Sequence, residues 1–309
     1  MQDSFARFDM LAFPKKQRLR AIAWAISYPD VWKHQSKIQK INMNGVKPPY
    51  VLLCNHNAFL DFKVTTAAIF PHRANYVVAI DGFTSPTKKG FASREWLLRV
   101  VGCVCKRKFT NDAVLVRQLS RVVKNGDIAV LYPEARYSLC GTNAVLPDSL
   151  GKLCKLLRVP VVTLIMHGHH VNSPVWNISD RGVKPVEAEM TCLFTAEALA
   201  KASSEEVNKA INAAFVYDDF AWQQKRGIRI PTPTRAEGLH KVLYQCPHCK
   251  IECRMRSKGT ELICDACGKH WQMDEYGSLR AIEGETEFSH IPDWYEWERA
   301  NVRREVEAG

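Results

Sequence analysis

Residues 51–62 have the sequence VLLCNHNAFLDF, and the first half of the chain is organised around them. The apolar run at residues 50–54 has the length and composition of a buried strand. It stops abruptly, which places His56 at the strand's end, and we expect the chain to turn there into a helix. That turn would bring Asp61 back towards the imidazole ring.

A carboxylate beside a histidine has a defined chemical use. If Asp61 accepts a hydrogen bond from one ring nitrogen of His56, it fixes the tautomer, and the other nitrogen can take a proton from a hydroxyl. The alternative is a structural loop histidine, because this spacing also arises by chance. Cys54 is a conceivable nucleophile, but its place at the end of an apolar strand favours a buried structural thiol.

Two later stretches are predicted to deliver side chains to the same edge of a sheet. A strand predicted at residues 127–131 ends in Tyr-Pro-Glu-Ala-Arg-Tyr-Ser, which contains Glu134 and Arg136. A second apolar strand, predicted at residues 159–166, opens with Val-Pro-Val-Val. Ligands bind outside the carboxyl ends of strands in open α/β sheets. We therefore expect His56 and Glu134 to converge on one crevice.

These blocks together resemble the glycerolipid acyltransferase family, of the 1-acylglycerol-3-phosphate acyltransferase type, over about residues 45–215. Asn55-His56-x4-Asp61 is similar to the family's first block, residues 131–138 to its third, and residues 159–162 to its fourth. The resemblance implies an α/β fold with a central mixed sheet flanked by helices. It also implies direct acyl transfer, with His56 as general base and Asp61 as its orienting carboxylate.

The resemblance also implies the substrates. The donor would be acyl-CoA or acyl-carrier protein, with no catalytic cofactor and no covalent enzyme intermediate. The acceptor would be the hydroxyl of a lysophospholipid, and 1-acylglycerol-3-phosphate, giving phosphatidic acid, is the expected one. Two rival classes stay open: a thioesterase or lipid ester hydrolase that uses the same His-Asp pair on water, and a nucleic-acid or protein adaptor.

Three residues are implied to bind the acceptor's headgroup: Glu134, Arg136 and Arg107. In the place of the family's second block, either Arg107 or Lys108 fits the phosphate contact, and the alternative is a solvated basic strand end. The third block departs from the pattern, because Tyr137 takes the usual arginine position and the guanidinium moves to Arg136. The alternative for Glu134 is a structural acceptor for loop amides.

Composition bounds the class of protein. The chain has 309 residues, of which 46% are hydrophobic and 24% charged, as in an ordinary folded protein. It lacks both a run of about eighteen apolar residues and the basic, apolar start of a secretory signal, so we expect no transmembrane segment and no signal peptide. Eleven cysteines fit a reducing compartment. A cytoplasmic chain is the expectation.

Charge is divided unevenly along the chain. The formal net charge is +11, made of +14 over residues 1–240 and −3 over residues 241–309. A basic first part suits an anionic partner, such as a phosphate-bearing substrate or an anionic membrane surface. The predicted helix at residues 15–28, basic first and aromatic later, can lie in a bilayer interface or pack on the core. We expect peripheral membrane association.

Cysteines near the carboxyl end give the clearest local signal. Two Cys-x2-Cys pairs are separated by fourteen residues, the spacing of a closed tetrahedral zinc site. Four thiolates leave no open position, so the zinc is predicted to be structural. The strands of the resulting zinc ribbon are predicted at residues 254–263 and 270–273. The ligands are Cys246, Cys249, Cys264 and Cys267.

Further expectations concern the remaining segments. The run His167-Gly168-His169-His170 invites a metal hypothesis, but no partner ligand has an evident spacing, so a strand-end loop near the cleft is the prediction. Nucleic-acid binding by the ribbon is unlikely because the module is acidic. The predicted division is an amphipathic helical region (1–40), a catalytic domain (41–226), a linker (227–240), the zinc ribbon (241–283) and an acidic, aromatic-rich tail (284–309).

Overall fold

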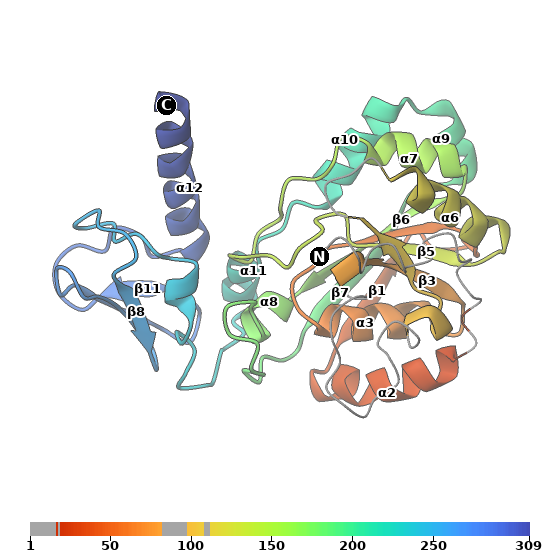
Figure 1. Cartoon of the computed structure of the whole chain (residues 1–309). Coiled ribbons are helices and arrows are strands. Elements are labelled where there is room, and N and C mark those ends of the chain that lie inside the picture. The colour runs from red at the N-terminus through yellow and green to blue at the C-terminus, as the bar shows by residue number, and fades with distance from the viewer. Residues whose placement is uncertain (1–16, 18, 82–97, 108–111) are drawn as a thin grey trace.

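A seven-stranded sheet forms the centre of the first part of the chain (Figure 1). This computed structural model describes residues 17, 19–81, 98–107 and 112–309. The strand order is β1-β7-β6-β2-β5-β3-β4, and neighbours are parallel except β6 and β7, which are antiparallel. The predicted mixed α/β sheet is therefore confirmed. The strands are β1 (Lys37–Ile41), β2 (Val51–Cys54), β3 (Ala74–Ala79), β4 (Val104–Lys106), β5 (Ile128–Leu131), β6 (Val161–His167) and β7 (Glu187–Phe194).

Helices cover both faces of this sheet (Figure 1). In β2, Leu52 packs in a cluster with residues of α3, and its neighbour Leu53 packs in a second cluster with residues of α6 and α7. Every residue of β2 and β5 is buried, which explains their uninterrupted apolar sequences. The helices are α2 (Arg20–Lys33) and α3 (Leu60–Ile69) on one face, and α6 (Ala113–Lys124), α7 (Leu150–Leu157), α9 (Ala196–Lys201) and α10 (Ser204–Ala214) on the other.

The first helix differs from the prediction. Helix α2 continues to Lys33, five residues beyond the predicted end, and contains Pro29. Pro29 is exposed, so water can satisfy the carbonyl that the proline leaves without a donor, while Val31 anchors the last turn in the core. Residues 15, 16 and 18 of the predicted helix lie outside the described residues. The sequence also predicts a helix at residues 91–101, and residues 91–97 of that helix lie outside them too.

The carboxyl-terminal part forms a second, four-stranded antiparallel sheet in the order β11-β10-β9-β8. Its strands are β8 (Met255–Lys258), β9 (Glu261–Cys264), β10 (His270–Met273) and β11 (Leu279–Ala281). Within residues 254–263, where ribbon strands were predicted, the chain forms a hairpin, because Gly259, at a positive φ of 61°, turns the chain between β8 and β9. With the cysteine cluster described below, this sheet has the form of a zinc ribbon.

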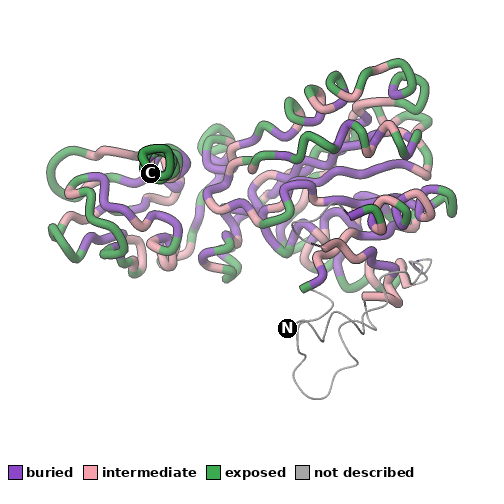
Figure 2. The backbone as a smooth tube through the Cα atoms, turned by 45° about the horizontal axis from the view of Figure 1, so that its top comes forward, coloured by how far each residue is buried: buried purple, intermediate pink, exposed green. Residues whose placement is uncertain are grey.

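A third hydrophobic cluster joins the ribbon to the rest of the chain. Figure 2 shows buried positions in the ribbon as well as in the larger part of the chain. Residues 227–240 contribute buried side chains to it, among them Ile230 and Leu239. Helix α11 (Asp219–Arg226) packs Phe220 against Gly277, where a Cβ atom would come within 2.5 Å of the phenyl ring. The tail forms helix α12 (Ile291–Ala308), which buries Trp294 against Trp271 of the ribbon.

Candidate active site

Three parallel strands end at the same edge of the sheet. β2 lies between β5 and β6, with Leu53 opposite Leu131 on one side and Cys54 opposite Leu164 on the other. The segments that follow these strands carry His56, Glu134 and His169. The expected convergence of the His56 and Glu134 segments is seen directly, because the His56 backbone N–H donates to Glu134 Oε2 (3.3 Å).

The side chain of Asn55 fixes the end of β2 to the end of β6. Its amide donates to the carbonyl of Met166 (2.8 Å) and accepts from the N–H of Met166 (2.8 Å). Both residues are fully buried. These two hydrogen bonds continue the β2–β6 hydrogen-bonding pattern by one residue, with a side chain in place of the backbone. They fix the position of the next residue, His56, relative to the sheet.

His56 and Asp61 form the contact that their spacing predicted. The His56 Nδ1 atom lies 3.1 Å from Asp61 Oδ2. The same oxygen accepts from the backbone N–H groups of Asn57 (2.6 Å) and Ala58 (2.9 Å), so Asp61 closes the turn at the start of α3. Asp61 is fully buried, whereas the His56 side chain is 23% exposed. In this pair, the orienting carboxylate of Asp61 is buried and the imidazole of His56 is partly accessible to solvent.

A second histidine, which the sequence prediction missed, reaches the same carboxylate. His169 Nδ1 lies 2.6 Å from Asp61 Oδ1, and both side chains have no exposed surface. His169 opens the short helix α8 (His169–Asn172) one residue after β6, where the sequence predicted a loop. Its position after an apolar strand was the only available signal, and the same signal drew attention to His56.

These contacts determine the charge of Asp61. Burial alone would raise the pKa of the Asp61 carboxyl, but hydrogen bonds from His169 and then His56 lower it to about 2. An ionised carboxylate only accepts hydrogen bonds, so both imidazoles must donate to it through Nδ1. In the neutral form of His56, this leaves Nε2 as the unprotonated nitrogen on the open side of the ring.

Two aromatic side chains enclose the imidazole of His56. The ring centroid of Tyr132 lies 4.4 Å from that of His56, and the centroid of Tyr137 lies 4.2 Å from it. The backbone N–H of Ser138 donates to the carbonyl of His56 (2.7 Å). Tyr137 thus contacts the candidate base, which gives a structural use to the residue that stands in the family's arginine position.

Glu134 is buried below this loop. Its Oε2 atom accepts from the His56 backbone N–H (3.3 Å). The Tyr217 hydroxyl, which has one hydrogen to donate, lies within reach of both Asn57 Oδ1 (3.0 Å) and Glu134 Oε2 (3.3 Å). Burial raises the pKa of Glu134 to about 7. These contacts match the alternative in which the carboxyl supports loop amides.

The two arginines considered for a headgroup occupy different surroundings. Arg136 is exposed, one residue from the ring that covers His56. Arg107 follows β4 at the opposite edge of the sheet from β1, and its Nη2 atom lies 3.2 Å from Asp112 Oδ1. Asp112 also caps α6, so this ion pair has a structural use. Lys108 lies outside the described residues.

Cys54 is fully buried, and burial raises the pKa of its thiol well above the usual range. A thiol held in this state is a poor nucleophile, since the thiolate is the reactive form. The buried structural role expected for Cys54 agrees with this placement.

The histidine-rich turn is organised by a second carboxylate. Asp219 accepts from the backbone N–H groups of Gly168 (3.0 Å) and His170 (2.8 Å), and burial raises its pKa to about 7. Burial lowers the pKa of His167 to about 4 and that of His170 to about 3, so both rings are neutral near pH 7. Asp219 and Asp61 therefore hold this turn from its two sides.

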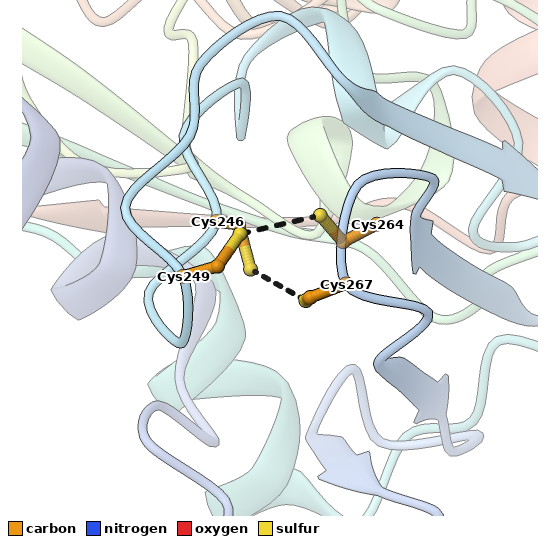
Figure 3. Close-up of side chains that lie close together, drawn as sticks. All are labelled: Cys246, Cys249, Cys264 and Cys267. Carbon is orange, nitrogen blue, oxygen red and sulfur yellow. Dashed lines mark hydrogen bonds between the residues drawn. The ribbon is translucent and has the colours of Figure 1, made fainter.

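Four cysteines meet in the ribbon: two from a turn before β8, one at the end of β9 and one in the turn that follows β9 (Figure 3). Their sulfur atoms lie within 4.8 Å of one another, with Cys246 to Cys267 and Cys249 to Cys264 both at 3.8 Å. A tetrahedral zinc with Zn–S bonds of about 2.3 Å requires sulfurs about 3.8 Å apart. The donor set and its dimensions thus fit a structural zinc ion.

A match to a family model agrees with the sequence blocks. Residues 32–167 match the family model described as Acyltransferase, and this segment contains all three blocks quoted above. The crystal structure of the 1-acyl-sn-glycerophosphate (LPA) acyltransferase PlsC from Thermotoga maritima is similar over 64% of this chain and 77% of that chain, with a TM-score of 0.49 and 13% sequence identity. No sequence among the curated proteins matches this chain.

Proposed function

We propose that residues 32–167, which match the Acyltransferase family model, form part of a domain that transfers a fatty acyl group from an acyl thioester to the hydroxyl of a lysophospholipid. The observation that carries the proposal is the His56–Asp61 contact, in which a buried carboxylate orients an imidazole whose other nitrogen faces the open side. The proposed acceptor is 1-acylglycerol-3-phosphate, and the proposed donor is acyl-CoA or acyl-carrier protein.

The reaction follows from this arrangement. His56 Nε2 takes the proton of the acceptor hydroxyl as its oxygen attacks the thioester carbonyl. Asp61, ionised at pH 7, stabilises the imidazolium that forms. The tetrahedral intermediate then collapses, the C–S bond breaks, and the imidazolium returns the proton to the leaving thiolate. No covalent enzyme intermediate is needed, which agrees with the buried, high-pKa thiol of Cys54.

Headgroup recognition is proposed for Arg136. It is exposed and adjacent in sequence to Tyr137, which lies against His56, so a guanidinium can reach a phosphate held near the open side of the ring. Arg107 is a second proposed contact, although its pairing with Asp112 reduces the charge that it offers. The contacts of Glu134 favour support of the His56 loop over direct contact with the acceptor.

A lipid acceptor requires access to a membrane, and the surface beside the site is suited to one. The solvent-facing side of α2 presents Ile22 (55% exposed), Ile26 (68%) and Trp32 (75%), and Phe59 beside His56 is 68% exposed. Large apolar side chains exposed together mark membrane or protein contacts. None of the helices within the described residues is long and apolar enough to cross a bilayer. We therefore propose peripheral association through this face of α2.

The test is an acyl-transfer assay on the full-length, zinc-loaded protein. Labelled acyl-CoA and acyl-carrier protein are each supplied with 1-acylglycerol-3-phosphate or with buffer alone. Labelled phosphatidic acid formed only with acceptor supports the proposal. Release of labelled fatty acid at the same rate with and without acceptor would identify a hydrolase instead. No turnover with either donor across a panel of lysophospholipids would favour the adaptor class.

A further inference from the structure

Asp61 is the buried centre of the candidate site, and its two oxygens have different partners. Oδ2 accepts from His56 and from the backbone N–H groups of Asn57 and Ala58. Oδ1 accepts from His169. The side chain of Asp61 can rotate about its last bond, and the partner of Oδ1 acts together with the two backbone N–H groups on Oδ2 to fix that rotation.

We infer that His169 is a positioning residue for the acyl transfer proposed above. Its Nδ1–H fixes the rotation of the Asp61 carboxylate and keeps it ionised, so that Oδ2 stays directed at His56. The inference rests on the proposed function for its kinetic consequence, but the hydrogen-bond arrangement itself does not depend on which reaction is catalysed.

His169 cannot act by touching the substrate. Its side chain has no exposed surface, and its Nε2 atom is buried without a hydrogen-bond partner within the described part of the chain. The 2.6 Å contact to an ionised carboxylate is the charge-assisted kind, which is about twice as strong as a neutral hydrogen bond. The strong polar contact of the His169 ring is therefore made to Asp61, the group that orients His56.

The turn that carries His169 is itself held in place. Asp219 accepts from the backbone N–H groups on both sides of His169, those of Gly168 and His170. Gly168 has a positive φ of 87°, and a Cβ atom there would come within 2.9 Å of the Trp222 ring. A fixed backbone on one side and a buried carboxylate on the other leave the imidazole a single orientation, as positioning requires.

The test compares His169→Phe with His169→Asn, using His72→Asn on the surface as the matched control. Phenylalanine fills the space but cannot donate, whereas asparagine keeps an N–H close to the place of Nδ1. We expect kcat to fall about 100-fold or more in the phenylalanine variant with KM within about threefold, and the asparagine variant to recover at least about tenfold of that loss. A phenylalanine variant with unchanged kcat, or an asparagine variant as impaired as it, overturns the inference.

A measurement on the wild-type protein needs no turnover. Long-range ¹H–¹⁵N spectra of ¹⁵N-histidine-labelled protein report the tautomer of each ring, and His169→Asn and His56→Ala assign the two signals. We expect both rings to carry hydrogen on Nδ1. His169 with hydrogen on Nε2 alone would overturn the inference. If the wild-type protein transfers no acyl group but both tautomers are as expected, the proposed function fails and the hydrogen-bond arrangement stands.

Discussion

Replacement of Asn55 by alanine tests how the site is attached to the sheet. The Asn55 side chain makes two 2.8 Å hydrogen bonds to the backbone of Met166, one as donor and one as acceptor. After truncation the Met166 carbonyl keeps a donor, because the amide of Asn57 lies 3.3 Å away, but the Met166 N–H has lost its acceptor in a fully buried position.

The size of the effect follows from this asymmetry. Leaving the buried Met166 N–H without an acceptor costs about 1–3 kcal/mol, and losing the hydrogen bond from Asn55 to the Met166 carbonyl costs about 1 kcal/mol more. We expect Asn55→Ala to lower the free energy of unfolding by about 3 kcal/mol. Asn212→Ala, which removes one exposed side-chain bond to the carbonyl of Asn208, should change it by less than about 0.5 kcal/mol.

The assay is guanidinium-induced unfolding of both variants and of wild type in the presence of zinc. A midpoint shift of Asn55→Ala with an unchanged slope is expected, since the surface exposed on unfolding stays the same. A loss below about 1 kcal/mol, or a loss equal to that of Asn212→Ala, would refute the account of Asn55 as the attachment between β2 and β6.

Three further predictions concern the ribbon, the buried glutamate and the membrane face. Cys264→Ser, or chelation, should release zinc and red-shift the fluorescence of the ribbon's buried tryptophans, whereas Cys253→Ser, outside the cluster, should do neither. Because burial raises the pKa of Glu134 from 4.5 to about 7, the native state holds a proton that the unfolded chain releases, so wild-type stability should fall as pH rises from 4.5 to 7. Between pH 4.5 and pH 7, the unfolding free energy of Glu134→Gln should decrease by about 3 kcal/mol less than that of wild type. The measurement is the unfolding free energy of both proteins at several pH values in this range, and an equal pH dependence would contradict the prediction. Trp32→Glu should weaken sedimentation with anionic vesicles about tenfold, and Val306→Glu on α12 should not; equal effects would exclude α2 as the membrane face.

Local signals were enough for the parts of the fold with strong patterns. The buried strands at residues 51–54, 128–131 and 161–167 were predicted from uninterrupted apolar runs. By contrast, β1 has the sequence KIQKI, with every residue exposed or half-buried, and forms only because it pairs with β7. Helices α8 and α11 are short and depend on tertiary contacts.

The same limit applies to the site. His56 and Asp61 are five residues apart, so one turn explains their contact and the spacing predicted it. His169 reaches Asp61 from 108 positions along the chain, and Tyr217 reaches Asn57 from 160. Contacts of that separation depend on which strands become neighbours, and no local pattern carries that information. The buried position of Glu134 was likewise not visible in its sequence block.

The central claim is that His56 is the general base of an acyl transfer. Its most direct test is the rate of labelled phosphatidic acid formation from acyl-CoA and 1-acylglycerol-3-phosphate by wild type, His56→Ala and His72→Ala, all zinc-loaded. His72 is exposed and remote from the β2 end, so its variant is the matched control. The account predicts a loss of about 100-fold or more for His56→Ala and wild-type activity for His72→Ala. A His56→Ala protein that still forms phosphatidic acid at the wild-type rate would contradict it.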